Sequence, residues 1–394
     1  MLNARRAGRK APNRKTTQKY GVILPEDEAC LCGKIKGMPP EQDANHKPRI
    51  LHAPTNIAGI AGLLSRAQRD LGYDSTSVQY ISHKYAFETD RTLDLGRADN
   101  AAKKALTVGT FALDALRRYD VFHLYFGNTL FPYPYPDLPL LRAMGKRIVF
   151  HFCGCEVRNR AITLEKYEVS GCSECISLVC LGKRHPDPSK ADVTLVSTPD
   201  LLEFVPGAQL MPGPVDMARW TPRPPRTEPI SPEHPVRILH APSDREIKGT
   251  RHLMDAIERL RAEGYPVELL MLEGVPHEQV AQFCSQADIA VDQLMIGAYG
   301  TVSIEMMATG VPVVCRIRDD LRHHYPAGLP IISAGPDDVY DVLEDLLQRP
   351  ETWNEVGRKG VEYVRQEHEM HVVAERTLAL YDEGRKTKDE GRGS

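Results

Sequence analysis

The sequence predicts an α/β protein built from two Rossmann-like halves, each with a mainly parallel sheet, on either side of a proline-rich connector. An internal repeat is the main evidence: the residues Arg-Ile-Leu-His-Ala-Pro at 49–54 recur at 237–242. Each copy is a short apolar run that stops at a proline, as a buried strand does. Each is also followed by the same order of elements, namely a loop, an amphipathic helix and a second strand. Two unrelated α/β domains are the alternative, which would require an accidental match of six residues together with the same order of elements after it.

The two repeated helices are predicted from apolar residues at helical spacing. These residues are Leu63, Leu64, Ala67 and Leu71 in the first half and Leu253, Met254, Ile257 and Leu260 in the second. Both patterns stop at a glycine followed by a tyrosine, with the glycines at Gly72 and Gly264. Glycine fits the left-handed backbone that commonly follows a helix.

Further apolar runs predict the remaining strands, at 75–80, 121–126, 147–152, 193–197, 267–272, 289–293, 311–316 and 329–333. Helical patterns alternate with these runs, which is typical of parallel sheets. Such sheets bind ligands at the carboxyl ends of their strands. Two facing sheets therefore predict a central cleft that receives two substrates.

We expect six segments along the chain. They are a basic and mostly irregular extension (1–48), a first Rossmann-like domain (49–220), the proline-rich linker (221–235), a second Rossmann-like domain (236–365), a C-terminal helix packing back on the first domain (366–383) and a disordered tail (384–394). The extension carries seven Arg and Lys residues and no acid in its first 19 positions. A mobile basic arm is one interpretation, and contact with a membrane surface or an acidic partner is the other.

The composition is that of an ordinary globular protein, with 42% hydrophobic and 26% charged residues. A net charge of -3 over 394 residues gives no general attraction to nucleic acid. The sequence shows no apolar run of the roughly 20 residues that span a bilayer, and no apolar signal-peptide core. We therefore expect a cytoplasmic protein whose contact with membranes is at most peripheral.

Two basic residues follow the repeated strand of the second half. Arg245 and Lys248 lie between that strand and a helix predicted to start near Thr250. Cations beside a helix N-terminus, where backbone N–H groups are unpaired, suit a diphosphate. An exposed loop with ordinary surface charges is the alternative.

A second helix start strengthens the phosphate hypothesis. Gly300 and Thr301 lead into a short helical stretch, where the glycine allows close approach of a ligand and the threonine is a good N-cap. Glu305 lies one turn further, where a carboxylate suits the paired hydroxyls of a ribose. Taken alone, Glu305 also fits a solvated position on a helix.

These motifs resemble the retaining glycosyltransferases of the GT-B fold known as family 4 or group 1. Residues 305–314, Glu-Met-Met-Ala-Thr-Gly-Val-Pro-Val-Val, are similar to the family signature Glu-Ala-Met-Ala-x-Gly-x-Pro-Val-Val. The turn Met-Pro-Gly-Pro-Val-Asp at 211–216 and the segment from Arg245 to Gly249 also resemble family motifs. The resemblance covers roughly residues 49–383.

The resemblance implies a two-substrate enzyme that needs no cofactor, with the acceptor bound by the first domain (49–220) and the nucleotide-sugar by the second (236–365). The donor would be a UDP-, GDP- or TDP-sugar, and the acceptor a small molecule, a glycan or a lipid-linked compound. Arg245, Lys248 and Thr301 would stabilise the leaving diphosphate without a metal ion, and Glu305 would hold the ribose. His151 would position the donor sugar, with Glu156 a weaker candidate for contacting the acceptor.

Two glycine positions belong to the same comparison with the family. Ala58-Gly59 stands where the family has a glycine pair after its first strand. The family's first carboxylate, which contacts donor-sugar hydroxyls, falls at Gly297 in this chain. Backbone N–H groups of the glycine-rich turn could replace that carboxylate, or activity could be weakened. A GT-B epimerase or phosphorylase, or a non-catalytic sugar-nucleotide-binding protein, are the remaining functional classes.

Five cysteines lie close together in the chain, at Cys153, Cys155, Cys172, Cys175 and Cys180. A structural zinc ion bound by four of them is one interpretation, and free thiols are the other, because the spacing is not that of a standard zinc finger. A zinc ion there would brace a loop beside His151 and take no part in catalysis.

Overall fold

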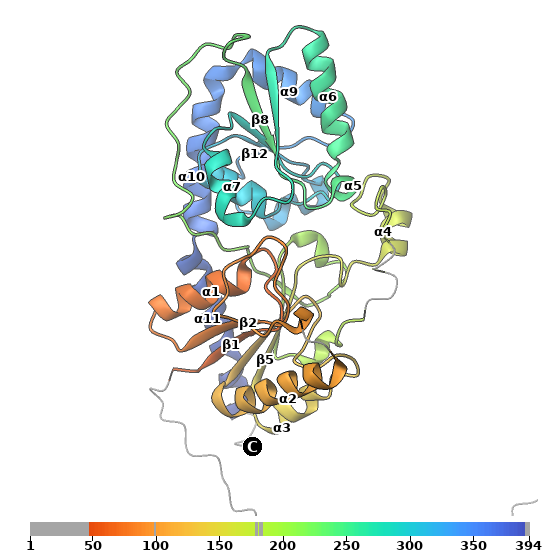
Figure 1. Ribbon diagram of the computed structural model, residues 1–394, viewed down its shortest axis with the longest axis vertical. Helices are drawn as coiled ribbons and strands as arrows, with labels where there is room; N and C mark the ends of the chain where they lie inside the picture. Colours follow the sequence, from red (N-terminus) through yellow and green to blue (C-terminus); the bar gives the residue numbers. More distant parts are fainter. Residues whose placement is uncertain (1–46, 98–99, 178–179, 181–183, 391–394) are drawn as a thin grey trace, which may run out of the picture. The chain divides into compact units, whose positions relative to one another are not determined.

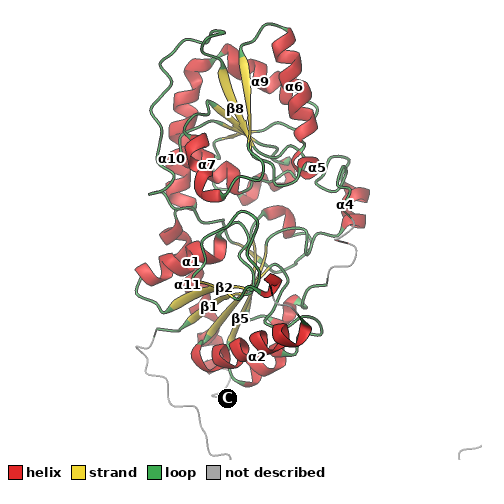
Figure 2. Ribbon diagram, in the orientation of Figure 1, coloured by secondary structure: helices red, strands yellow, loops and turns green. Residues whose placement is uncertain are grey.

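The computed structural model describes residues 47–97, 100–177, 180 and 184–390. The basic arm of residues 1–19 lies outside this range, as does the end of the predicted tail. Helices flank both faces of two parallel sheets (Figures 1 and 2). The predicted pair of α/β halves is therefore confirmed. No helix among the described residues is long and apolar enough to cross a membrane.

The first sheet has the order β3-β2-β1-β4-β5-β6-β7, and every pairing in it is parallel. Its strands are β1 (Ile50–Ala53), β2 (Ser75–Gln79), β3 (Arg91–Thr92), β4 (Val121–Tyr125), β5 (Arg147–Phe152), β6 (Val193–Val196) and β7 (Gln209–Leu210). The order 3-2-1-4-5-6 within it is that of a Rossmann sheet. The two edge strands β3 and β7 are two residues long and were not predicted.

The second sheet has the order β9-β8-β10-β11-β12, again with parallel pairing throughout. Its strands are β8 (Val236–His240), β9 (Val267–Met271), β10 (Ile289–Val291), β11 (Val313–Val314) and β12 (Ile331–Ile332). Renumbered within this half, the order is 2-1-3-4-5, the other common doubly wound arrangement. Its strands match the predicted positions and are shorter than the apolar runs.

Helices cover both faces of the first sheet. They are α1 (Ile60–Asp70), α2 (Ala101–Arg118), α3 (Asp137–Ala143) and α11 (Met370–Glu390), whereas α4 (Arg160–Lys166) lies away from the sheet (Figure 1). The side chains of β1, β4, β5 and β6 enter two separate clusters, one shared with α1 and α11 and the other with α2 and α3. The last helix of the chain therefore packs against the first half.

The second sheet is covered in the same way. Its helices are α5 (Arg245–Lys248), α6 (Thr250–Ala262), α7 (His277–Cys284), α8 (Thr301–Ala308), α9 (Val339–Gln348) and α10 (Trp353–Glu367). One face packs on α6 and α9, and the other on α8 and α10. Short 3₁₀ helices complete the chain at Leu95–Arg97, Pro188–Lys190, Pro199–Leu201, Asp319–His324 and Pro350–Thr352.

The repeat predicted from sequence is a structural repeat. β1, α1 and β2 correspond to β8, α6 and β9. The glycines that follow the two helices, Gly72 and Gly264, have φ of +82° and +91°. Both adopt the left-handed conformation expected after a helix. Residues 221–235 contain neither helix nor strand and run alongside the second half, where Arg226 pairs with the buried Asp288.

Candidate active site

Two adjoining cavities lie between the halves. The smaller one, of about 360 Å³, is lined from both halves. The larger one, of about 570 Å³, extends toward α10 and α11. Ile57, Ala58 and Thr301 line both cavities. The junction therefore lies at the start of α8 and at the loop after β1, where the carboxyl ends of parallel strands place a ligand.

Lys248 is the ion-paired lysine of the smaller cavity, which the exposed Lys84 of the first half also lines. Lys248 ends the short helix α5, whose N-cap Asp244 accepts a hydrogen bond from the backbone of Ile247 at 3.0 Å. Its Nζ lies 2.7 Å from both Asp292 Oδ1 and Gln293 Oε1. Those partners hold the ammonium group at the end of β10, and the site is therefore already formed before any ligand arrives.

Asp292 connects Lys248 to the start of α8. Its other oxygen, Oδ2, accepts hydrogen bonds from the Gly300 backbone at 3.1 Å and from Ser303 Oγ at 2.7 Å. Burial alone would raise the pKa of Asp292, but the charge of Lys248 and these hydrogen bonds hold that pKa below its usual value. The carboxylate therefore stays ionised and fixes the lysine beside the helix N-terminus.

Arg245 is placed differently from the sequence prediction. It lies on α5 and not in an open loop, and its guanidinium forms a two-bond ion pair with Glu273 at 2.7 and 2.5 Å. The side chain is half-exposed and lines neither cavity. Lys248 and Arg245 are therefore not brought together on one wall.

The start of α8 supplies the second part of the site. Gly300 is the N-cap, so Thr301 is the first helical residue and not the cap that the sequence suggested. A Cβ added at Gly300 would lie 3.4 Å from Asp292 Oδ2 and 3.6 Å from Lys248 Nζ. Glycine therefore leaves room for the ion pair beside the unpaired N–H groups that open a helix.

Glu305 lies one turn into α8 and lines the smaller cavity. The residue is 4% exposed, which excludes the solvated position considered from the sequence. Its Oε1 is 2.5 Å from Nε2 of His277, the first residue of α7. This histidine was not predicted, because the helical pattern of α7 gives no sign of which residue will face α8.

A segment of the first half forms the opposite wall of the smaller cavity. His83, Tyr85 and Phe87 contribute to it. The ring of Phe87 lies 4.9 Å from the ring of His277. The backbone N–H of His277 donates to the carbonyl of Tyr85 at 3.1 Å. Sequence analysis missed these residues because they belong to the half that was expected to bind the acceptor.

His151 lies inside the first sheet and not on a cavity wall. It is 1% exposed, with Nδ1 3.2 Å from His123 Nε2 and Nε2 3.1 Å from Ser197 Oγ. Burial lowers the pKa of His151 to about 3, with a smaller contribution from His52. Cys153, two residues further along, lines the larger cavity together with Ser197.

Gly59 and Glu156 make local contacts and line neither cavity. Ala58 and Gly59 both adopt left-handed backbone, with φ of +51° and +76°, and lead directly into α1. Ala58 lines both cavities, whereas Gly59 faces Phe87. Glu156 is buried and accepts a hydrogen bond from the backbone of Cys153, and it lines neither cavity.

Gly297 is enclosed by an arginine. Its φ is +87°, and an added Cβ would lie 2.5 Å from Cγ of Arg318. The Arg318 guanidinium stacks on Tyr167 at 3.8 Å and pairs with Asp320. At the position where the related family has its first carboxylate, this chain therefore has a glycine that is covered by the aliphatic part of the Arg318 side chain.

The cysteine cluster forms no metal centre within the described part of the chain. No group of three or more His, Cys, Asp or Glu residues there is arranged to hold a metal ion. The Sγ of Cys155 lies 3.5 Å from Nη1 of Arg158, which forms a buried ion pair with Asp200. The five thiols are free, so the zinc interpretation finds no support in these residues.

Comparison with known proteins shows which fold this chain has. Residues 245–379 match the family described as "Glycosyl transferase-like". Sucrose-phosphate synthase of Thermosynechococcus elongatus superposes with a TM-score of 0.56 at 16% identity, over 86% of this chain and 99% of that structure. Anabaena Alr3699/HepE in complex with UDP and glucose gives 0.55 at 11% identity, over 85% and 99%. The chain has the GT-B fold.

Other similarities agree with this assignment. The catalytic domain of Arabidopsis thaliana starch synthase IV, bound to ADP and acarbose, superposes with a TM-score of 0.53 at 12% identity, over 86% of this chain and 99% of that one. A curated relative, the MMP α-(1→4)-mannosyltransferase of Mycolicibacterium hassiacum, is 25% identical over 173 residues. That match spans 37% of this chain and 42% of the mannosyltransferase, which is less than half of either protein. Lys248, Thr301 and Glu305 all fall within the family match.

Proposed function

We propose that the protein is a glycosyltransferase that transfers a sugar from a nucleotide-sugar donor to an acceptor with retention of anomeric configuration. One observation carries the proposal: Lys248, the N-terminus of α8 and the Glu305 carboxylate line a single cavity. A cation beside helix N–H groups suits a diphosphate, and a carboxylate one turn away suits a vicinal diol. A nucleoside diphosphate combines both.

The donor sugar extends from the diphosphate into the larger cavity. Thr301 and Ala58 line both cavities, so a group attached to the diphosphate passes between them. Beyond this point the wall includes Ser197, whose hydroxyl is held by His151. His151 thus acts as a positioning residue through Ser197, and the acceptor enters from the far part of the larger cavity.

The chemistry is governed by charge. Breaking the bond between the anomeric carbon and the diphosphate leaves positive character on the sugar and negative charge on the phosphate. Lys248 and the N-terminus of α8 stabilise that negative charge from fixed positions. Arg245 assists when a phosphate oxygen replaces Glu273 as its partner. The acceptor attacks on the face that the diphosphate leaves, and the departing phosphate accepts its proton.

The first experiment measures which nucleotide sugars bind. A ligand that binds the folded chain raises its melting temperature, so UDP-, GDP- and TDP-sugars can be compared by thermal shift. Turnover of the preferred donor is then measured with and without acceptors. Transfer that requires an acceptor supports the proposal. Isomerisation of the donor alone, or consumption of inorganic phosphate, would instead indicate an epimerase or a phosphorylase.

Glu305→Gln tests the ribose contact. The amide keeps the shape and one acceptor but loses the charge, so donor affinity should fall by about 1.5–3 kcal/mol, the scale of a hydrogen bond to a charged group. Inorganic pyrophosphate should bind as before, and the fold should hold. Glu278→Gln, an exposed change on the neighbouring α7, is the matched control. Equal donor affinity in the Glu305 variant and the wild type would contradict this role.

A further inference from the structure

The smaller cavity has an aromatic wall that comes from the first half. The rings of His83 and Tyr85, and those of His83 and Phe87, lie 5.2 Å apart in each case. Across the cavity the second half presents Leu272, Val275 and Val280. An aromatic surface facing an aliphatic one is suited to a flat ring system with exposed π-faces.

The aromatic wall lies at the nucleoside end of the cavity. Phe87 packs against His277 at 4.9 Å between ring centroids, and His277 Nε2 is 2.5 Å from the Glu305 carboxylate. Glu305 marks the ribose in the proposed function. Phe87 therefore lies close to the ribose and its base, whereas the sugar end leads away past Thr301.

Two polar contacts fasten this segment to the second half. The N–H of His277 donates to the carbonyl of Tyr85 at 3.1 Å, and Lys84 Nζ donates to the carbonyl of Ser243 at 3.4 Å. Both partners in the second half lie beside the donor loops, one at the start of α7 and one just before α5. The wall therefore spans the two halves at the donor site.

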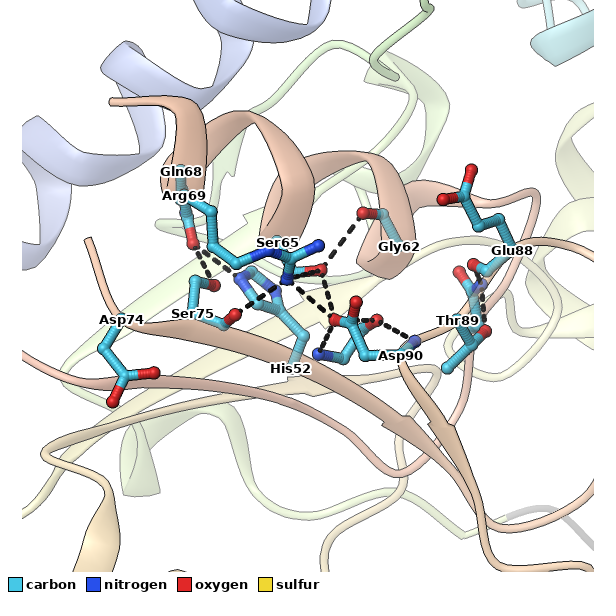
Figure 3. A network of polar contacts seen from close by, with 12 residues as sticks. His52, Gly62, Ser65, Gln68, Arg69, Asp74, Ser75, Glu88, Thr89 and Asp90 are labelled. Carbon is cyan, nitrogen blue, oxygen red and sulfur yellow. Dashed lines mark hydrogen bonds and ion pairs between the residues drawn. The ribbon is translucent and has the colours of Figure 1, made fainter. Parts of the chain in front are cut away.

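Hydrogen bonds to Asp90, three residues after Phe87, hold the same segment on the first half (Figure 3). The Asp90 carboxylate accepts hydrogen bonds from Ser65 Oγ at 2.9 Å, Arg69 Nη1 at 2.9 Å and the backbone of Ser77 at 2.7 Å. These donors come from α1 and β2, so a single carboxylate joins the end of the segment to two rigid elements.

The start of α1 fixes the other side of the segment. Asn56 donates to the carbonyl of Glu88 at 2.8 Å and to Thr89 Oγ1 at 2.9 Å. Gly62 lies so close to the same carbonyl that an added Cβ would stand 2.1 Å from the oxygen. Such anchoring gives the aromatic side chains a fixed backbone, which lowers the entropic cost of ordering them around a ligand.

We propose that residues 83–87 form the second wall of the donor site and stack on the nucleoside of the donor, with Phe87 as the main contact and Asp90 as its positioning residue. This inference rests on the proposed function, because it assigns an aromatic contact to the same nucleoside diphosphate. It makes donor binding depend on both halves. Every base has a π-face, so the contact strengthens binding of uridine, guanosine and adenosine diphosphates alike.

The test compares two ligands on the full chain by calorimetry, the best-binding nucleoside diphosphate and inorganic pyrophosphate. Phe87→Leu keeps an apolar side chain against Gly59 and removes the aromatic face. We expect nucleoside diphosphate affinity to fall about 10-fold, in line with the loss of one stacking contact. Pyrophosphate affinity should stay within about twofold. Phe87→Tyr should restore nucleotide binding, and Tyr133→Leu, at a tyrosine 60% exposed elsewhere on the first half, should change neither ligand.

Asp90→Asn tests the positioning role. It keeps the shape of the side chain but weakens the bond from Arg69, so nucleotide affinity should fall several-fold with pyrophosphate unaffected. The double variant Phe87→Leu/Asp90→Asn should bind nucleotide about as Phe87→Leu does, because the ring that Asp90 positions is already gone. Additive losses would show that Asp90 affects nucleotide binding independently of Phe87, and its positioning role would be wrong.

Two outcomes separate this inference from the proposed function. If Lys248→Ala and Glu305→Gln weaken nucleotide binding and Phe87→Leu does not, the aromatic wall is wrong and the function stands. If the wild type binds no nucleoside diphosphate, both fail. Equal loss of nucleotide and pyrophosphate in Phe87→Leu also overturns the wall, because stacking cannot act on a ligand without a base.

Discussion

The two copies of the repeat solve the same packing problem with different partners. His52 and His240 stand at the same place in β1 and β8, and both are fully buried. His52 bonds Tyr125 of the next strand at 2.7 Å and Gln68 of α1 at 2.8 Å. His240 bonds the Val291 carbonyl at 2.8 Å and Thr250 Oγ1 of α6 at 2.9 Å. In each half the histidine thus ties the strand to its neighbour and to the following helix.

The halves diverge immediately after the repeated proline. The first half passes through Ala58 and Gly59 directly into α1, and apolar Ile57 and Ala58 face the cavities. The second half inserts α5, which brings Lys248 to Asp292 before α6 begins. Both halves share the repeated strand and the helix that follows it, but they differ in the loop between the two. The difference in charge at the proposed donor site therefore comes from a four-residue helix. The first half contributes aromatic and apolar surface instead.

The largest effect should come from Lys248, which α5 holds against Asp292 in the second half. Lys248→Ala leaves the buried Asp292 without its partner, and breaking a buried pair in this way costs about 3–5 kcal/mol of stability. Nucleotide binding should be lost as well. Urea unfolding and calorimetry measure the two effects.

A double variant separates binding from stability. Lys248→Met/Asp292→Asn removes both charges, so part of the stability should return while nucleotide affinity stays low. A double variant that binds nucleotide as the wild type does would show that Lys248 is structural, and the proposed difference between the halves would disappear.

The buried histidines should make the first half the more acid-sensitive one. Burial lowers the pKa of His52 to about 4 and of His151 to about 3, and it lowers that of His123 as well. At acid pH the unfolded chain binds protons that the buried histidines of the folded chain do not bind. The free energy of unfolding is therefore highest above about pH 6.5 and falls as the pH drops below it. Between pH 7 and pH 5 each of these histidines takes up a proton on unfolding, so the free energy of unfolding should fall over this range.

In the second half, burial also lowers the pKa of His240 in the sheet and lowers that of His368, after α10, to about 4. Hydrogen exchange at pH 7 and 5 compares the halves strand by strand. We expect β1, β4 and β5 to lose protection before β8 and β10 do. A uniform loss of protection across both sheets would contradict this prediction.

Two glycines with left-handed backbone offer a finer test. Gly59 and Gly297 have φ of +76° and +87°. An added Cβ would be 3.4 Å from Phe87 at Gly59 but 2.5 Å from Arg318 at Gly297. Alanine at either position incurs backbone strain of about 1–2 kcal/mol. Gly297→Ala should cost about 1–3 kcal/mol more, because it also overpacks the arginine stem.

Thermal unfolding of the two alanine variants measures that difference. Arg318→Ala should remove most of the excess cost of Gly297→Ala and leave Gly59→Ala unchanged. Gly297→Glu, which restores the family carboxylate, should reduce transfer for the same steric reason. Equal or faster transfer by Gly297→Glu would show that Arg318 yields and that the turn is a degraded version of the family site.

Local patterns in the sequence were enough to predict the scaffold and part of the site. The repeated strands, the helix ends at Gly72 and Gly264 and the closeness of Lys248 to the start of α8 all depend on short-range spacing and on strand ends meeting at one edge. The two-residue strands β3 and β7 are too short for any alternation to show. His277, Phe87 and Arg318 were missed because each reaches the site from a distant part of the chain. The misplacement of His151 has a similar cause, since two residues along β5 separate the sheet interior from the cavity.

The smallest expected effect is that of metal ions, whose removal should not change the transfer rate. In the proposed mechanism the leaving diphosphate contacts Lys248, whose ammonium group Asp292 holds in place, and the N–H groups that open α8. A divalent cation would have to compete with these groups for the same phosphate oxygens. We therefore expect EDTA to leave the transfer rate unchanged, with added magnesium or manganese giving no gain. The melting temperature, measured in the same samples, tests the cysteine cluster separately: zinc bound by thiolates would make EDTA lower it without changing the initial rate. Loss of transfer on EDTA treatment with recovery on magnesium would show that the cations of the second half do not suffice.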